Sequence, residues 1–163
     1  MSDPVLAAIE GLGVEFEMIP CDPELADTAQ FCEAYGYPLD ESANTILVVG
    51  KSDPRVYVAC VVLASTRLDV NGRVKKKLGI RRTSFASADE TLEVTGQTIG
   101  GVTPFGLPDD LPIWIDARVV DRERIILGGG SRDRKVHAPP EILTALPNAE
   151  VVADLAKEFE PPA

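Results

Sequence analysis

The stretch 44-NTILVVG-50, followed by the turn 51-KSDP-54 and by 55-RVYVACVVL-63, holds two apolar runs long enough for paired strands. β-Branched residues dominate both runs, and the apolar residues are nearly continuous instead of alternating with polar ones. Strands of this composition are typically covered on both faces. The sequence therefore predicts a central pair of strands against which the other elements pack.

Three elements are expected before this pair of strands, on the basis of capping and periodicity signals. They are a helix from Asp3-Pro4 to Gly11 or Gly13, a strand over Val14–Pro20, and a helix from Asp22-Pro23 to Gly36. On the second helix, Leu25, Ala29 and Cys32 are spaced to share one buried face.

The same signals predict further helices and strands after the pair. In order, these are a helix capped by Asp69 and closed by Gly79, a capping-box helix from Ser87 to Gly96 with Leu92 inside, strands at Ile113–Ala117, Arg124–Gly130 and near Arg134–His137, and a helix from Pro139-Pro140.

The chain has 163 residues, of which 45% are hydrophobic, and helices are interspersed with hairpin-like pairs of strands. This length and composition suit one domain, residues 1–163, with its own core. The pattern predicts a mixed α/β or α+β domain around one curved sheet. The tail from about residue 154 alternates weakly and ends in EFEPPA, so we expect it to fray.

No apolar run approaches the roughly 18 residues of a membrane-spanning helix, and the start MSDPVLAAIE lacks the basic segment of a signal peptide. We therefore expect a cytoplasmic protein with no membrane partner. Cys21, Cys32 and Cys60 are an odd number of thiols at long spacings, which suits a reduced state. The single histidine, His137, leaves too few nitrogen and sulfur ligands for a zinc site, so we expect no metal and no cofactor.

The net charge of −10 is unevenly distributed. The first 50 residues hold ten acids and no lysine or arginine, whereas the rest of the chain holds 16 acids and 16 bases. The bases form two groups: Arg67, Arg73, Lys75, Lys76, Lys77, Arg81 and Arg82, and then Arg118, Arg122, Arg124, Arg132, Arg134 and Lys135. Such groups suit either a phosphate-binding surface or the solvated faces of a helix and of strands.

The sequence contains no GxSxG, HExxH, Walker or GxGxxG motif. Asp109-Asp110 and His137 are more typical of a solvated loop and of a structural residue than of catalysis. Two glycine segments remain, Gly100–Gly106 (GGVTPFG) and Gly128–Gly130. Glycine lets backbone N–H groups approach a ligand closely, so these segments either bind an oxyanion or a phosphate or form two ordinary turns.

Four segments occur in the order and at the spacings of a known family: NTILVV, VKKKLGIRRTSFASADE, TGQTIGGVTPFGLPDDLPIWID and RIILGGGSRDRKVHAPPEIL. Over nearly its whole length the chain resembles the YbaK/prolyl-tRNA-synthetase-associated domains, and Gly100–Pro104 matches their G-x-x-x-P loop. The resemblance implies a single compact α+β domain with a curved, mixed, barrel-like sheet flanked by helices. It also implies a free-standing, trans-acting protein that hydrolyses the ester of mischarged tRNA carrying a small amino acid. Its expected partners are aminoacyl-tRNA and, as a further candidate, an aminoacyl-tRNA synthetase.

The resemblance assigns roles to three groups of residues. The catalytic group is Asn44, Thr45, Gly100 and Gly101, and the nucleic-acid-binding group is Lys75, Lys76, Lys77, Arg81 and Arg82. The substrate-binding group is Val102, Thr103, Pro104, Phe105, Gly106, Gly128, Gly129 and Gly130. An aminoacyl ester is labile, so positioning and a few donors to the developing oxyanion can supply much of the rate without a metal.

Two positions depart from the family pattern. Asn44 stands where characterised relatives usually have lysine, and Gly128 stands where they often have serine. Asparagine donates and accepts hydrogen bonds but brings no positive charge. Besides a deacylase, the sequence is therefore compatible with a non-catalytic tRNA- or synthetase-binding module, or with hydrolysis of a different small acyl ester.

Overall fold

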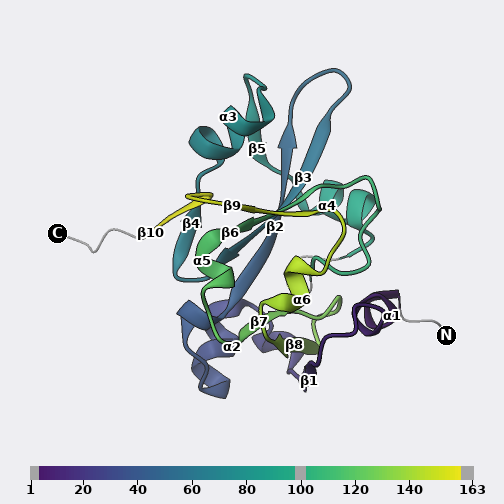
Figure 1. Ribbon diagram of the computed structural model, residues 1–163, viewed down its shortest axis with the longest axis vertical. Helices are drawn as coiled ribbons and strands as arrows, with labels where there is room; N and C mark the ends of the chain where they lie inside the picture. The colour runs from purple at the N-terminus through teal and green to yellow at the C-terminus, as the bar shows by residue number, and fades with distance from the viewer. Residues whose placement is uncertain (1–3, 98–101, 159–163) are drawn as a thin grey trace.

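The computed structural model describes residues 4–97 and 102–158. At its centre, β2 (Ala43–Gly50) and β3 (Val56–Leu63) form the predicted antiparallel hairpin, which runs through the middle of Figure 1. Every residue of β2 pairs with β3, from Ala43 opposite Leu63 to Gly50 opposite Val56. The hairpin therefore provides the long strands to which the shorter ones are added.

Short helices and strands surround the hairpin. The helical elements are α1 (Pro4–Glu10), η1 (Pro23–Leu25), α2 (Thr28–Tyr35), η2 (Leu39–Glu41), η3 (Val70–Val74), α3 (Lys75–Leu78), α4 (Ala88–Thr95), α5 (Ala117–Val120) and α6 (Glu141–Thr144). The remaining strands are β1 (Glu17–Pro20), β4 (Thr66–Leu68), β5 (Thr83–Phe85), β6 (Ile113–Asp116), β7 (Ile125–Gly128), β8 (Arg134–Ala138), β9 (Ala149–Val152) and β10 (Ala156–Glu158).

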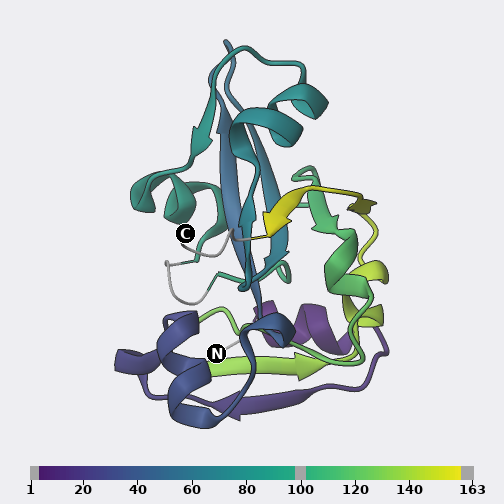
Figure 2. The same ribbon diagram turned by 90° about the vertical axis from the view of Figure 1, so that its left-hand side faces the viewer.

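The strands form three sheets within the described residues. The largest has the order β5-β2-β3-β6-β9, with antiparallel pairing among β5, β2 and β3 and parallel pairing from β3 to β6 and β9. A second, antiparallel sheet of β1, β8 and β7 crosses the lower end of the hairpin in Figure 2, and β10 pairs with β4. The predicted α+β class and mixed sheet are confirmed, although the strands are divided among three sheets instead of one.

Both faces of the hairpin are buried, as its apolar runs predict. Leu47 and Val61 belong to the larger core cluster, whereas Val48 and Cys60 belong to a second cluster on the opposite face. Successive side chains of a strand point to opposite faces, so a strand that fills two cores needs an uninterrupted apolar run. Burial raises the pKa of the Cys60 thiol well above its ordinary value, and all three cysteines are free and buried.

Several capping signals locate helix ends, although the helix predicted from Asp22-Pro23 is divided into the 3-10 helix η1 and α2, which starts at Thr28. Ser87 and Glu90 form the predicted capping box of α4, in which each side chain accepts a hydrogen bond from the other residue's backbone N–H. Gly36, Gly79 and Gly96 end α2, α3 and α4 in the left-handed conformation that glycine adopts most easily.

Two helix positions that the sequence predicts to be buried are exposed. Ala29 of α2 and Leu92 of α4 face solvent, and the two helices bury Phe31 and Thr91 instead. Phe31 stacks on Tyr35 and is fully enclosed, which orients α2 by its largest buried side chain. Eight-residue helices carry too few apolar residues to define a face, so tertiary contacts decide it.

The first residues of the C-terminal tail that we expect to fray from about residue 154 form a strand instead. Ala156–Glu158 pair with Leu68, Arg67 and Thr66 as β10 against β4. Leu155 and Ala156 are buried in the second core cluster. A short strand is stable here because the side chains of Leu155 and Ala156 anchor it in the core. This long-range contact cannot be read from the weak alternation of apolar and polar residues in the tail.

Truncating Leu155 to alanine tests this anchoring. Leu155→Ala should lower the free energy of unfolding by about 2–5 kcal/mol, because it opens a cavity in a filled core. Urea denaturation measures the change. Val151→Ala, at an exposed position of the preceding strand, should stay within about 0.5 kcal/mol of wild type. Equal stability of the two variants would show that the tail is not docked.

Candidate active site

A cavity of about 390 Å³ lies beside the first half of β2. β5 pairs only with Val48–Gly50. Within the described residues, the pairing with β7 is one isolated bridge, between Ile126 and Ser42 just before β2. The strand edge between these two pairings is therefore open. Among the described residues, those that line the cavity are Ala26, Asp27, Thr28, Phe31, Ala43, Asn44, Thr45, Ile46, Leu47, Phe85, Ala86, Thr91, Val102, Ile126, Leu127, Gly128 and Lys135. The site is therefore built on an incompletely paired strand.

The open edge of β2 presents backbone groups to the cavity. The Ser42 carbonyl accepts from Ala64 N–H on the β3 side, whereas the Leu47 carbonyl accepts from Ala86 N–H on the opposite side. Backbone groups alternate in direction along an antiparallel strand, so those of Thr45 point to the same side as those of Leu47. Among the described residues they have no backbone partner there. Thr45 thus offers one donor and one acceptor to a ligand.

The side chain of Asn44 is held by Thr28 at the start of α2. Thr28 Oγ1 donates a hydrogen bond to Asn44 Oδ1 over 2.5 Å. This contact leaves the Asn44 NH₂ group without a partner among the described residues, and Thr45 Oγ1 is buried there without a partner too. A fixed amide with free N–H donors can polarise a carbonyl in the cavity.

Lys135 is a cavity-lining residue that the sequence pattern does not single out. The sequence places it in the second basic group, which suits either a phosphate-binding surface or a solvated face, but it is only 6% exposed and lines the cavity from β8. Its Nζ donates to the carbonyl of Ala26 over 2.6 Å and lies 5.5 Å from the centre of the Phe31 ring. Burial lowers the pKa of Lys135 below its ordinary value, partly opposed by Cys21 and Asp27. Lys135 and its neighbour Val136 are both buried, so burial does not alternate along β8 and no local pattern signals that Lys135 faces inward.

Four of the predicted catalytic and substrate-binding residues line the cavity together: Asn44, Thr45, Val102 and Gly128. They come from β2, from the segment before β6 and from the end of β7. Gly100 and Gly101 lie outside the described residues. The fold therefore brings these four residues, which are distant in the sequence, together at one cavity.

The rest of the predicted substrate-binding loop points into the protein instead of into the cavity. Phe105 is fully buried in the larger core cluster, and Thr103 and Pro104 are buried beside it. Gly106 has a positive φ of 74° and packs against the backbone of Pro4. The apolar residues of this segment are explained by core packing, which places Phe105 away from the amino acid that we expected it to contact.

A buried glutamine holds this loop in place. Gln97 Nε2 donates to the Phe105 carbonyl over 3.0 Å, and Gln97 Oε1 accepts from the N–H of Thr103 over 2.9 Å. Gln97 is itself buried. The two bonds fix the backbone next to Val102, which is the residue that this loop contributes to the cavity.

Gly129 and Gly130 serve the turn after β7 and do not line the cavity. A Cβ on Gly129 would lie 2.8 Å from the carbonyl oxygen of Arg134. Gly130 has a φ of 90°, and a Cβ there would lie 2.6 Å from the side chain of Val5. Close backbone approach requires glycine at both positions. We therefore assign them to packing, whereas Gly128 stays in the candidate site.

The predicted nucleic-acid-binding residues differ in their accessibility. Lys76, Arg81 and Arg82 are exposed, and Lys75 is half-buried. Lys77 has partners within the protein: its Nζ forms an ion pair with Glu150 over 2.7 Å and lies over the ring of Trp114.

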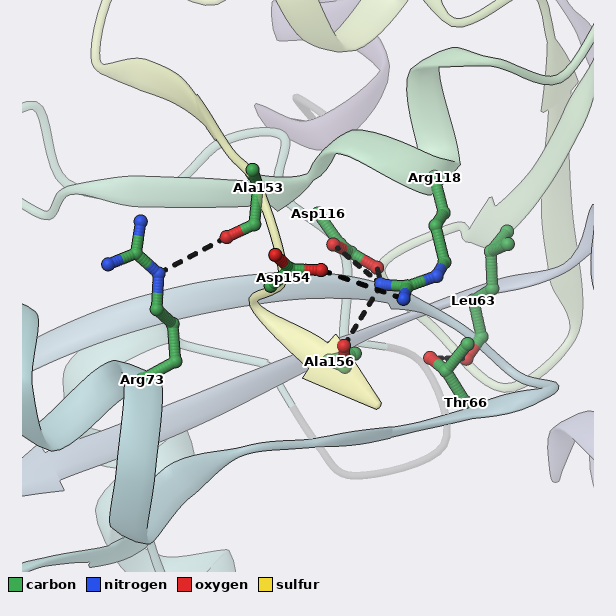
Figure 3. A network of polar contacts seen from close by, with 8 residues as sticks. All are labelled: Leu63, Thr66, Arg73, Asp116, Arg118, Ala153, Asp154 and Ala156. Carbon is green, nitrogen blue, oxygen red and sulfur yellow. Dashed lines mark hydrogen bonds and ion pairs between the residues drawn. The ribbon is translucent and has the colours of Figure 1, made fainter. Parts of the chain in front are cut away.

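Members of the two basic groups also hold the C-terminal strands, as Figure 3 shows. Arg118 forms an ion pair with the fully buried Asp116 over 3.2 Å and donates to the carbonyl of Ala156 over 2.9 Å. Arg73 donates to the carbonyl of Ala153 over 3.1 Å. These two arginines therefore have structural partners, in a second cavity that also contains Asp69, Asp154, Lys157 and Glu158.

His137 lies outside the candidate site. Its ring contacts Tyr37 edge-on with 5.7 Å between centroids, and burial together with Arg124 lowers its pKa. No group of three histidine, cysteine, aspartate or glutamate side chains in residues 4–97 and 102–158 is arranged to hold a metal ion. In the same ranges, no helix combines the length and hydrophobicity that crossing a membrane requires.

The fold and the cavity define a class of protein, a mixed α+β domain with a small-ligand site at an open sheet edge. Residues 22–146 match the model of the aminoacyl-tRNA editing domain, and the chain belongs to this family. The match spans the cavity-lining segments from η1 to β8.

Two curated relatives and two solved structures are similar to this chain. The uncharacterized protein YwhH of Bacillus subtilis is 27% identical over 135 residues, which are 83% of either chain. The "Putative Cys-tRNA(Pro)/Cys-tRNA(Cys) deacylase EbsC" of Enterococcus faecalis is 24% identical over 127 residues, 77% of this chain and 75% of that protein. The hypothetical protein APE2540 superposes with a TM-score of 0.84 at 24% identity, over 95% of this chain and all of that one. The crystal structure of "a putative trans-editing enzyme for prolyl tRNA synthetase" superposes with a TM-score of 0.80 at 24% identity, over 98% of this chain and 99% of that one.

Proposed function

We propose that this protein is a trans-acting aminoacyl-tRNA deacylase that hydrolyses the ester of a mischarged tRNA carrying a small amino acid. The observation that carries the proposal is the cavity at the open edge of β2, which Asn44, Thr45 and Gly128 line together. Membership of the aminoacyl-tRNA editing domain family supports it. The cavity volume of about 390 Å³ falls in the range of small-ligand sites, roughly 300–1,000 Å³.

The donors at the edge of β2 suit an acyl-transfer reaction. The N–H of Thr45 and the NH₂ group of Asn44 can bond the ester carbonyl oxygen and stabilise it as negative charge develops. Thr28 keeps the Asn44 amide in one orientation, so no reorganisation is needed. A water molecule then attacks the carbonyl carbon. The prediction that Gly100 and Gly101 supply further donors stays a prediction.

The apolar wall of the cavity suits selection by size. Leu47, Val102 and Leu127 face the space that the amino acid side chain would fill. Such walls separate substrates by about 1–3 kcal/mol for each methylene group. This discrimination is sufficient to reject larger amino acids but leaves several small ones as candidates.

Phe85 at the end of β5 is placed to receive the terminal adenine. It lines the cavity and yet is 57% exposed, which is unusual for a large aromatic residue. Exposed aromatic rings beside nucleic-acid sites stack on unpaired bases. We assign Phe85 to the adenine of the tRNA 3′ end, with the esterified ribose pointing into the cavity.

Exposed basic residues precede β5, the strand that carries Phe85. β5 begins directly after Arg82 and ends at Phe85, a distance of roughly 10 Å along a strand. We propose that the phosphates of the acceptor stem, which follow the terminal adenine, meet Arg82 and Arg81 beside β5 and Lys76 of α3. Their contact with tRNA is expected to be independent of sequence and sensitive to salt.

One observation favours a second candidate function, a tRNA- or synthetase-binding module without catalysis. Asn44 is uncharged, so β2 brings no cation to a developing oxyanion. Such a module would keep the affinity for tRNA and lose the hydrolysis.

A panel of mischarged tRNAs separates the two functions. We expect the protein to release at least one small amino acid about a thousandfold or more above the spontaneous rate, because positioning and donors accelerate a labile ester. Asn44→Ala should lower that rate by about 10²–10³, the usual effect of removing an oxyanion donor. Asn71→Ala, at an exposed asparagine of η3, is the control and should change nothing. Binding of tRNA without release of any amino acid would establish the non-catalytic module instead.

Replacing Phe85 tests the adenine contact. Phe85→Ala should weaken binding of uncharged tRNA roughly fivefold to a hundredfold, since stacking on one base contributes about 1–3 kcal/mol. Fluorescence anisotropy measures the affinity at several salt concentrations. Leu92→Ala removes another exposed apolar side chain outside the cavity and should leave binding unchanged. The same loss in both variants would refute a specific role for Phe85.

The salt dependence of binding tests the basic surface. Lys76→Glu should weaken tRNA binding at low salt and reduce the slope of log affinity against log salt by about one, because one phosphate contact is lost. Arg124→Glu changes the charge equally in the second basic group and should leave the slope unchanged. If neither variant alters the slope, Lys76 belongs to an ordinary solvated face.

A further inference from the structure

Lys135 brings an ammonium group into the candidate active site. The side chain enters from β8 and is almost fully buried, and the Ala26 carbonyl is its one hydrogen-bond partner within the described residues. An ammonium group has three N–H donors, so two are left for a ligand. No carboxylate in residues 4–97 and 102–158 forms an ion pair with it.

Burying such a charge is costly unless something compensates for it. The Phe31 ring and the Ala26 carbonyl compensate only in part. The remaining direction open to the ammonium is the cavity, which Asn44 and Thr45 line from β2. A bound anion would therefore complete the coordination of Lys135.

We propose that Lys135 binds a negatively charged oxygen of the ligand in this cavity, and so supplies from β8 the positive charge that Asn44 does not supply from β2. The proposal rests on the proposed function for the identity of the ligand but not for the existence of the anion site. Two oxygens of an aminoacyl-tRNA end have this chemistry. One is the oxyanion formed from the ester carbonyl, and the other belongs to the phosphate on the 5′ side of the terminal adenosine.

The oxyanion arises in a balanced sequence of steps. The water oxygen forms a bond to the carbonyl carbon, and the electron pair of the C=O double bond moves to the oxygen that Lys135 faces. When this pair re-forms the double bond, the bond between carbon and ribose oxygen breaks. A proton from the water passes to that ribose oxygen, so the products are the free amino acid and the ribose hydroxyl.

The surroundings of Lys135 determine at what pH it carries its charge. The titratable and charged groups around it are Cys21, Cys32, Asp27 and Arg132, and Asp27 is shared with Arg132 over 3.7 Å. Burial dominates and lowers the pKa of Lys135, whereas Arg132 lowers it further and Asp27 and the two thiols raise it. The ammonium form is present below this pKa and is lost as the pH rises through it, so anion binding should weaken at alkaline pH.

The experiment compares wild type with Lys135→Met, Lys135→Arg and the control Lys51→Met, which removes an exposed lysine at the far end of β2. Methionine keeps the unbranched stem that packs in the cavity, and arginine keeps the charge. The probes are AMP and adenosine, whose affinities are measured by calorimetry, and the mischarged tRNA that wild type hydrolyses fastest.

Two results support the proposal and identify the oxygen. If Lys135 binds the phosphate, wild type, K135R and K51M prefer AMP to adenosine at least about tenfold, and K135M loses this preference. If it binds the oxyanion, K135M lowers kcat about a hundredfold or more with KM nearly unchanged. K135M with the wild-type AMP preference and the wild-type kcat would overturn the proposal.

The failure of this inference is distinguishable from failure of the proposed function. Loss of the AMP preference in K135M, in a protein that hydrolyses no ester, supports the anion site and rejects the deacylase. An active deacylase in which K135M changes neither the AMP preference nor kcat supports the proposed function and rejects the anion site. If K135M does not fold, the pH dependence of wild type and of K135R decides. The AMP preference or the kcat of wild type must fall as the pH rises through the lowered pKa of Lys135 while K135R keeps it. A wild-type preference and kcat that both follow those of K135R at every pH would contradict the proposal.

Discussion

The structure depends on the unequal pairing of β2. This strand is bonded to β3 along its whole length, but on its other side β5 covers only Val48–Gly50. Backbone groups at an open edge need partners, and here α2, β7 and the segment before β6 approach the edge without closing it. The result is a cavity whose wall contains the N–H and C=O of Thr45, which have no backbone partner among residues 4–97 and 102–158. The same feature that leaves the sheet incomplete thus creates the site.

The acidic first part of the chain and the rest of the chain contribute opposite charges to this cavity. Asp27 belongs to the N-terminal 50 residues, which contain acids but no lysine or arginine. Lys135 belongs to the rest of the chain, which contains acids and bases in equal number. Both line the same space. An aminoacyl ester has a positive amino group next to a carbonyl oxygen that becomes negative, so opposite charges on the cavity wall favour one orientation of the substrate. Net charge alone does not reveal this arrangement.

Local patterns predict the hairpin, the capping box at Ser87 and the strand that carries Asn44, because these depend on residues close in the sequence. They do not predict that Phe105 fills the core, since a Gly- and Pro-rich segment gives no sign of which way its side chains face. Lys135 is missed for a related reason. Its role depends on β8 packing behind α2 and beside β7, and that contact is set by the tertiary structure and not by any neighbouring residue. The sequence leaves open whether Lys135 faces a phosphate or solvent, whereas the tertiary structure buries it.

The central claim is that the open edge of β2 is the ligand site. Amide chemical-shift mapping with a non-hydrolysable probe, the alanyl amide of 3′-amino-3′-deoxyadenosine, tests it most directly. The account predicts that the largest shifts occur at the amides of Thr45, Ala86 and Gly128 around the cavity. Shifts confined to Gly72 and Lys157 in the second cavity, or the absence of any shift, would contradict it.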